Sequence, residues 1–203
     1  MYALVVNGNI VKHFSYPKGF EHNGNLYSQD IFTKWSKAEK EAIGIYEIIT
    51  DSNNYKDPAY YINTNEQYAF AYNQVVKFWN TAIPKRLNDE NAVDENGDPI
   101  LQDGVQVINY GLKTEKKRII KQQASGLLAP TDWYVVKASE VEGYTIPTNI
   151  TTFRAEVRTK SNEMESMIDA CTTVDELKAL YEYTEQQDGT LTRPLPTFPK
   201  EVI

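Results

Sequence analysis

The sequence predicts an α+β fold: a small β-rich N-terminal domain with one short helix, then a helical hairpin module and an extended C-terminal tail. Before about residue 105, short β-branched and aromatic runs alternate with turns rich in Asn and Gly. After it, apolar residues recur at the three- and four-residue spacing of amphipathic helices. We therefore predict a β-rich domain at 1–87, a linker or hairpin loop at 88–104, a helical module at 105–187 and a tail at 188–203.

The β-rich domain is expected to begin with a hairpin. Residues 2–6 and 10–14 are β-type runs on either side of Asn7, Gly8 and Asn9, and Asn-Gly in this position is a strong hairpin signal. A second turn is expected at residues 23–25, where the pattern Asn-Gly-Asn recurs before Leu26 and Tyr27.

One short helix is predicted at residues 37–43. Ser36 precedes it and Glu39 stands at the third helical position, which is the pattern of a reciprocal capping box. Gly44 is suited to end the helix in the left-handed conformation. The run at 45–50 is then expected to form a strand.

Residues 59–83 fit two patterns. Tyr68, Phe70 and Tyr72 alternate with polar or small residues, as in a half-buried strand, but a helical stripe also fits. Two strands that turn near Asn73 and Gln74 are favoured, because β-branched and aromatic residues are concentrated there. A further strand is possible at 105–110.

Three helices are predicted in the second half. The first covers 114–128 and ends before Pro130; the second begins near Pro147, and the third opens at Thr173 with a capping box completed by Glu176. The buried stripe of the second helix is expected to contain Ile150, Phe153, Val157, Met164, Met167 or Ile168, and Cys171. The tail at 193–199 is spaced by prolines and should be extended.

Composition excludes several classes of function. The formal net charge of -7 disfavours binding to nucleic acid or to an anionic membrane, which both require clustered Lys and Arg. No apolar stretch reaches the roughly 18 residues of a membrane span, and the N-terminal apolar run is too short for a signal peptide. The single cysteine, Cys171, excludes an intrachain disulfide.

Catalytic and metal sites are not expected. The two histidines, His13 and His22, have no nearby cysteine to complete a zinc site. Asp94, Asn96 and Asp98 have the spacing of a calcium loop, but the sixth position is proline and the twelfth is valine, so a solvated hairpin turn is favoured. We predict no enzymatic activity, no cofactor and no metal.

A resemblance to a known family lies between residues 111 and 183. The features that carry it are, in chain order, Gly111 to Lys113 opening a helix that ends at Leu127 and Leu128, then Thr131-Asp132-Trp133-Tyr134, then Ile146-Pro147, then a helix with Phe153, Arg154 and Arg158. This pattern resembles the phage tail assembly chaperone family and the C-terminal modules of phage tail-fibre assembly proteins. The N-terminal part, with Asp57-Pro58-Ala59-Tyr60-Tyr61, is similar to a companion domain of tailed-phage proteins.

The resemblance implies a non-enzymatic protein that binds a phage tail or tail-fibre protein in the host cytoplasm during assembly. A permanent place in the virion tail is the first alternative, and a glycan-binding module that uses the tyrosine-rich half is the second. A homo-oligomer is possible under each of them.

Four residues of the motif are candidates for partner binding: Trp133, Tyr134, Arg154 and Arg158. Aromatic and arginine side chains dominate the hot spots of protein interfaces. The competing interpretation is structural, with Thr131 or Asp132 capping the turn of the helical hairpin and Trp133 buried as its packing anchor. Arg154 and Arg158, four residues apart, would then reach Glu140 or Glu142.

Overall fold

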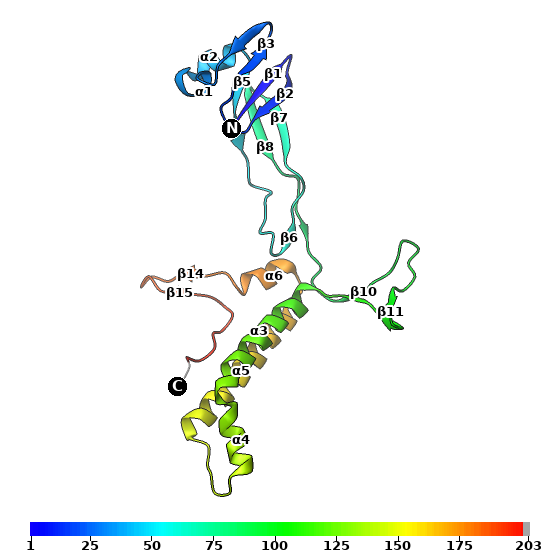
Figure 1. Ribbon diagram of the computed structural model, residues 1–203, viewed down its shortest axis with the longest axis vertical. Coiled ribbons are helices and arrows are strands. Elements are labelled where there is room, and N and C mark those ends of the chain that lie inside the picture. The colour runs from blue at the N-terminus through cyan, green and yellow to red at the C-terminus, as the bar shows by residue number, and fades with distance from the viewer. Residues whose placement is uncertain (201–203) are drawn as a thin grey trace. The chain divides into compact units, whose positions relative to one another are not determined.

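The computed structural model describes residues 1–200 and divides into two compact units, Met1–Ile83 and Pro84–Ile203 (Figure 1). The first unit contains a curled β-sheet and the second is dominated by helices. The predicted α+β class is therefore confirmed. Each unit is described by itself.

A five-stranded sheet forms the centre of the first unit. Its strands are β1 (Tyr2–Val6), β2 (Asn9–Phe14), β5 (Ile45–Thr50), β7 (Gln67–Ala71) and β8 (Gln74–Phe78). They follow the order β2-β1-β5-β8-β7, and β5 and β8 are the parallel pair. The sheet curls enough to bring its two edge strands together, since the rings of His13 and Tyr68 lie 4.3 Å apart.

Local turn chemistry sets both long hairpins of this sheet. Asn7 and Gly8 have φ of 51° and 79°, as a two-residue hairpin turn with a matching twist requires. Tyr72 and Asn73 have φ of 50° and 57°, so the second turn lies one residue earlier than expected. The prediction of two strands here, rather than a helix, is confirmed.

Alternating side chains of β1 belong to two apolar clusters, one on each face of the sheet. Ala3 and Val5 pack with Ile48 and Val75. Leu4, from the opposite face, belongs to the larger cluster, whose other buried members are Phe14, Phe20, Ile31, Phe32 and Ile45. Because β1 is covered on both sides, it is the most deeply buried strand of the unit.

Short elements supply the rest of the larger cluster. They are β3 (Phe20–His22), β4 (Asn25–Tyr27), α1 (Ile31–Lys34) and α2 (Lys37–Ala42). The predicted capping box of α2 is present, and Gly44 follows it with φ of 83°. The one-turn helix α1 was not expected, because four residues are too few to show helical periodicity. The strands β6 (Tyr61–Ile62) and β9 (Ile83–Pro84) complete the N-terminal elements.

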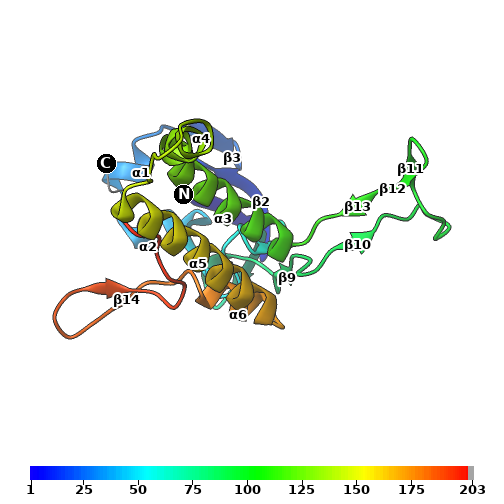
Figure 2. The same cartoon turned by 90° about the horizontal axis from the view of Figure 1, so that it is seen from below.

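Two long helices pack side by side in the second unit (Figure 2). They are α3 (Leu112–Leu128) and α5 (Thr148–Ala170). The predicted stripe on α5 is confirmed, with Ile168 rather than Met167 fully buried. The helix α6 (Val174–Ala179) starts at the predicted capping box of Thr173 and Glu176.

The C-terminal segment packs against these helices. It first forms a hairpin of β14 (Thr184–Glu185) and β15 (Leu191–Thr192), which the sequence analysis missed. Leu195 is then 2% exposed, its N–H donates to the carbonyl of Leu180, and Phe198 packs on Ala124, Phe153 and Val157. The described part of the predicted tail has no helix, as expected, but it packs on the helices instead of extending into solvent. Residues 201–203 of the predicted tail lie outside the described part of the chain.

Residues 90–109 form a β-ribbon, which we call the acidic arm. Its strands are β10 (Glu90–Asn91), β11 (Leu101–Gln102), β12 (Val105–Gln106) and β13 (Ile108–Asn109). The single strand expected at 105–110 is thus two short strands, each paired with a segment of the expected loop.

Candidate functional site

The helix α4 (Asp132–Glu140) has no buried residue, although it lies in the middle of the helical unit's sequence. It follows α3 through one 3-10 turn, η1 (Ala129–Thr131). Pro130 occupies the first turn of η1, where its missing N–H needs no partner, so the chain remains helical. The hairpin reverses only between α4 and α5. The expectation that the Thr131–Tyr134 motif is the turn itself is therefore wrong.

The first turns of α4 expose an apolar surface. The exposed fractions are 50% for Trp133, 41% for Val135 and 51% for Val136, and Val141 just beyond the helix is 48% exposed. The expectation that Trp133 is a buried packing anchor is wrong, because half of its surface is exposed and α4 buries no residue. A typical soluble surface carries such residues singly, whereas a contiguous group indicates an interaction site.

The two aromatic residues of the motif lie against each other. The ring centroids of Trp133 and Tyr134 are 3.9 Å apart with an interplanar angle of 34°. The ammonium group of Lys137 lies 5.6 Å from the Trp133 ring centroid and 4.4 Å from that of Tyr144. These cation–π contacts hold a positive charge at the edge of the aromatic surface.

Arg154 fixes the start of α4 from the neighbouring helix. It is 8% exposed, and its Nη1 donates to the Leu128 carbonyl at 3.0 Å and to Thr131 Oγ1 at 2.6 Å. The same nitrogen lies 2.8 Å from Asp132 Oδ1. Thr131 Oγ1 in turn donates to the Leu128 carbonyl at 2.7 Å. One buried arginine therefore joins the C-terminal end of α3 to the first turn of α4.

The two arginines of the motif, Arg154 and Arg158, differ in burial and in hydrogen-bond partners. Arg154 points into the protein, whereas Arg158 is exposed and its Nη1 donates to the Arg154 carbonyl one turn earlier, at 3.3 Å. The prediction that Arg154 pairs with Glu140 or Glu142 is wrong, because its ion-pair partner is Asp132. Of the four candidate residues, the structure brings Trp133 and Tyr134 together on α4, while Arg154 is buried and bonded to the residues just before and at the start of that helix.

The missed residues of this site are the valines of α4. Thr131 was expected to cap the turn, but its hydroxyl makes no capping bond and instead accepts from Arg154, a buried arginine that requires oxygen acceptors. No signal existed for the valines, since Val135 and Val136 fit a buried stripe equally well.

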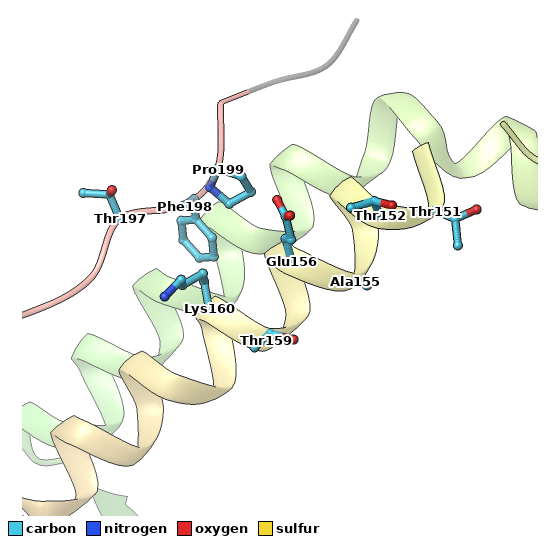
Figure 3. A pocket seen from close by; sticks show the side chains of 9 residues that line it. All are labelled: Thr151, Thr152, Ala155, Glu156, Thr159, Lys160, Thr197, Phe198 and Pro199. Carbon is cyan, nitrogen blue, oxygen red and sulfur yellow. The ribbon is translucent and has the colours of Figure 1, made fainter. Parts of the chain in front are cut away.

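A shallow groove of about 690 Å³ runs along α5 beside the C-terminal segment (Figure 3). Its described lining consists of Thr151, Thr152, Ala155, Glu156, Thr159, Lys160, Thr197, Phe198 and Pro199. Figure 3 shows the Phe198 ring lying against α5 between Glu156 and Lys160. Within this lining Glu156 is the one carboxylate, so a pair of acids for hydrolysis is not assembled there.

The other chemically suggestive residues have structural partners. Asp94 Oδ1 accepts the N–H groups of Asn96 at 2.8 Å and Asp98 at 3.0 Å, and these bonds close the turn whose spacing resembles a calcium loop. These hydrogen bonds, led by that from Asp98, lower the pKa of Asp94. Burial raises the pKa of Cys171, and its thiol donates to the Met167 carbonyl. In residues 1–200 no three His, Cys, Asp or Glu side chains are grouped to hold a metal.

Each helix within residues 1–200 is too short or too polar to cross a membrane. Comparisons of this chain with protein-family models, curated proteins and solved structures return no match.

Proposed function

We propose that this chain is a non-enzymatic assembly factor that binds a phage tail or tail-fibre protein through the exposed face of α4. The observation that carries the proposal is the pairing of the half-exposed Trp133 ring with the partly buried Tyr134 ring on a helix that buries no residue. Tryptophan, tyrosine and arginine are the residues most enriched in interface hot spots. The phage context comes from the resemblance of the Thr131–Tyr134 motif and the helices around it.

The way α4 is held supports a binding role. Arg154 fixes the first turn through Thr131 and Asp132, while none of the side chains that follow in α4 is buried. A helix that is ordered before binding loses less conformational entropy when a partner covers it. Val136, three residues after Trp133 and on the same side of α4, enlarges the apolar area that a partner helix or groove would bury.

Binding should be measured by calorimetric titration with purified phage tail and tail-fibre proteins. Trp133→Ala should weaken the complex by about 2 kcal/mol or more, as expected for a hot-spot aromatic. Tyr16→Ala is the matched control, because Tyr16 is 65% exposed and lies in the other unit. Unchanged affinity in Trp133→Ala alongside a measurable complex would exclude α4 as the binding surface.

A second measurement separates an assembly factor from a permanent virion component. Purified particles would be examined for this chain by quantitative mass spectrometry. An assembly factor should be absent or far below the copy number of the tail proteins. Stoichiometric presence would reject the assembly role and leave a structural tail subunit that uses the same surface.

A further inference from the structure

The acidic arm is the second part of the helical unit that packs against little else. Beyond its root, the described contacts of residues 90–109 are mainly those between its own strands. Figure 2 shows the arm extending away from the packed helices α3 and α5. It has two tips: the turn from Asp94 to Asp98, closed by the bridge between Val93 and Pro99, and the Asp103-Gly104 turn between β11 and β12.

The root of the arm is fixed to the first turn of α3. The Asp89 carboxylate accepts the N–H of Gly111 at 2.8 Å and the hydroxyl of Thr114 at 2.9 Å. The N–H groups of Leu112 and Lys113 donate to the carbonyls of Arg86 and Leu87. These bonds satisfy donors that the start of a helix would otherwise leave without a partner. The arm therefore leaves the helix at a defined position.

A glutamine holds the point where the arm divides into its two tips. Gln106 Nε2 donates to the carbonyls of Ala92 at 2.8 Å and Val107 at 2.9 Å, and that of Ile100 lies at 3.3 Å. Backbone bonds join the same three residues, and Ala92 is buried at this junction. The arm thus has a specific shape although no sheet or helix supports its outer part.

The outer part of the arm leaves apolar surface in solvent. Val93, Leu101 and Val105 are 53%, 58% and 69% exposed. A two-stranded ribbon is marginally stable alone in water, and its outer edges carry backbone groups able to pair with another strand. Leu101 and Val105 lie on opposite faces of the β11–β12 ribbon, because Leu101 is paired with Gln106 and Val105 with Gln102. A strand added along one edge places side chains on both faces, so it would cover part of this apolar surface while pairing the edge.

The charge of the arm indicates what kind of partner can cover it. Residues 90–109 contain the carboxylates Glu90, Asp94, Glu95, Asp98 and Asp103, and no Lys or Arg. The whole chain has a formal net charge of -7, so a second copy is on average repelled. A basic surface instead gains from complementary charge in both the rate and the specificity of association.

We propose that the acidic arm docks onto a second protein partner by pairing with an open β-strand whose neighbouring side chains are Lys and Arg. This surface is distinct from α4. The arm precedes the N-terminal end of α3 and α4 follows its C-terminal end, and the 17 residues of α3 span about 25 Å. The chain would therefore hold two partners, or two parts of one partner, at opposite ends of one rigid helix.

The test uses the full chain and a synthetic peptide of alternating lysine and valine as a defined basic strand. A glutamate–valine peptide of equal length is the probe control. Fluorescence anisotropy would compare the wild type with the arm variant Glu95→Gln, Asp98→Asn, Asp103→Asn. This variant keeps Asp94 and Gln106, which maintain the shape of the arm. The matched variant Glu21→Gln, Glu47→Gln, Glu185→Gln removes three exposed carboxylates elsewhere.

The wild type should bind the lysine–valine peptide at least about tenfold more tightly than the glutamate–valine peptide. The arm variant should lose about fivefold or more of this affinity, while the matched variant stays within about twofold of the wild type. Hydrogen exchange should slow at 90–109 when the lysine–valine peptide binds.

A second arm variant removes apolar area without changing charge. Leu101→Thr with Val105→Thr keeps β-forming residues at both positions and should also weaken peptide binding, by about threefold or more. Equal binding by all variants, or protection confined to residues outside the arm, would overturn the proposal. So would a dimer in light scattering that the arm variants abolish, because a second copy would then be the occupant.

Discussion

Arg154 Nη1 donates to Thr131 Oγ1 over 2.6 Å, although the two residues are 23 positions apart in the chain. This bond joins α5 to the residue that precedes the first turn of α4. Arg154→Met keeps the apolar stem of the side chain but removes its donors, and should destabilise the protein by about 2–3 kcal/mol. Urea unfolding would measure the loss. Arg158→Met is the control and should stay within about 0.5 kcal/mol, because Arg158 is exposed; equal losses would contradict the buried role.

Trp133 should contribute little to folding. Half of its surface is already in water and α4 buries no residue, so Trp133→Ala should cost less than about 1 kcal/mol. Phe153→Ala should cost about 3–5 kcal/mol, because this ring of α5 is 2% exposed and packs against Ala124 of α3. Thermal unfolding would measure the stability lost in each variant. A large loss of stability in Trp133→Ala would mean that α4 is covered in solution.

Leu195 should attach the C-terminal segment to the helices. Its side chain is 2% exposed and its N–H donates to the Leu180 carbonyl, so Leu195→Ala should cost about 2–3 kcal/mol. Leu191→Ala, at a position 64% exposed, should stay within about 0.5 kcal/mol. Limited proteolysis after residue 190 should accelerate in the first variant alone. Cleavage at the same rate in both would show that the segment does not depend on this leucine.

Two glycines should respond in opposite directions to alanine. A Cβ on Gly111 would lie 2.5 Å from the backbone of Asn88, so Gly111→Ala must displace the root of the arm, at a cost of about 2–4 kcal/mol. Gly126 lies within α3 with no atom within 4 Å of a Cβ, and Gly126→Ala should stabilise by about 0.5–1 kcal/mol. Chemical denaturation of both variants would show whether each one gains or loses stability. A more stable Gly111→Ala would contradict the close approach of Gly111 to the Asn88 backbone.

Acid should loosen the turn from Asp94 to Asp98. Hydrogen bonds from the Asp98 and Asn96 N–H groups lower the pKa of Asp94 below its ordinary value of 3.8. A lowered pKa means that the stabilisation is fully present above that value and is lost as pH falls through the lower folded pKa. Carbon NMR of the Asp94 carboxyl should titrate below pH 3.8. Asp94→Asn keeps the accepting oxygen and should make the exchange of these N–H groups independent of protonation in this range.

Elements defined by neighbouring residues could be predicted from the sequence. The Asn7-Gly8 turn, the capping boxes of α2 and α6, and the strand at 45–50 all follow the expected pattern. Their physical basis is local, because a turn residue must adopt positive φ and a capping side chain bonds an N–H three residues away. Even the ambiguous segment before residue 79 followed its β-branched and aromatic content.

The candidate site could be predicted only in part. The sequence singled out Trp133, Tyr134 and Arg154, but whether each faces solvent or core depends on which element lies opposite. A stripe of Trp133 and Val136 fits a buried helix as well as an exposed one. The predicted partner of Arg154 was wrong for the same reason: the chain stays helical through the 3-10 turn at Ala129–Thr131, and Asp132 is the carboxylate beside Arg154.

By itself, the sequence determined the mixed α+β class, most turns and helix starts, and the buried stripe of α5. The tertiary structure decided the parallel pairing of β5 with β8, the packing of Leu195, the separation of the acidic arm and the exposure of α4. The difference has one physical reason. Backbone conformation and capping depend on a few neighbouring residues, whereas burial depends on segments that are brought together only when the whole chain folds.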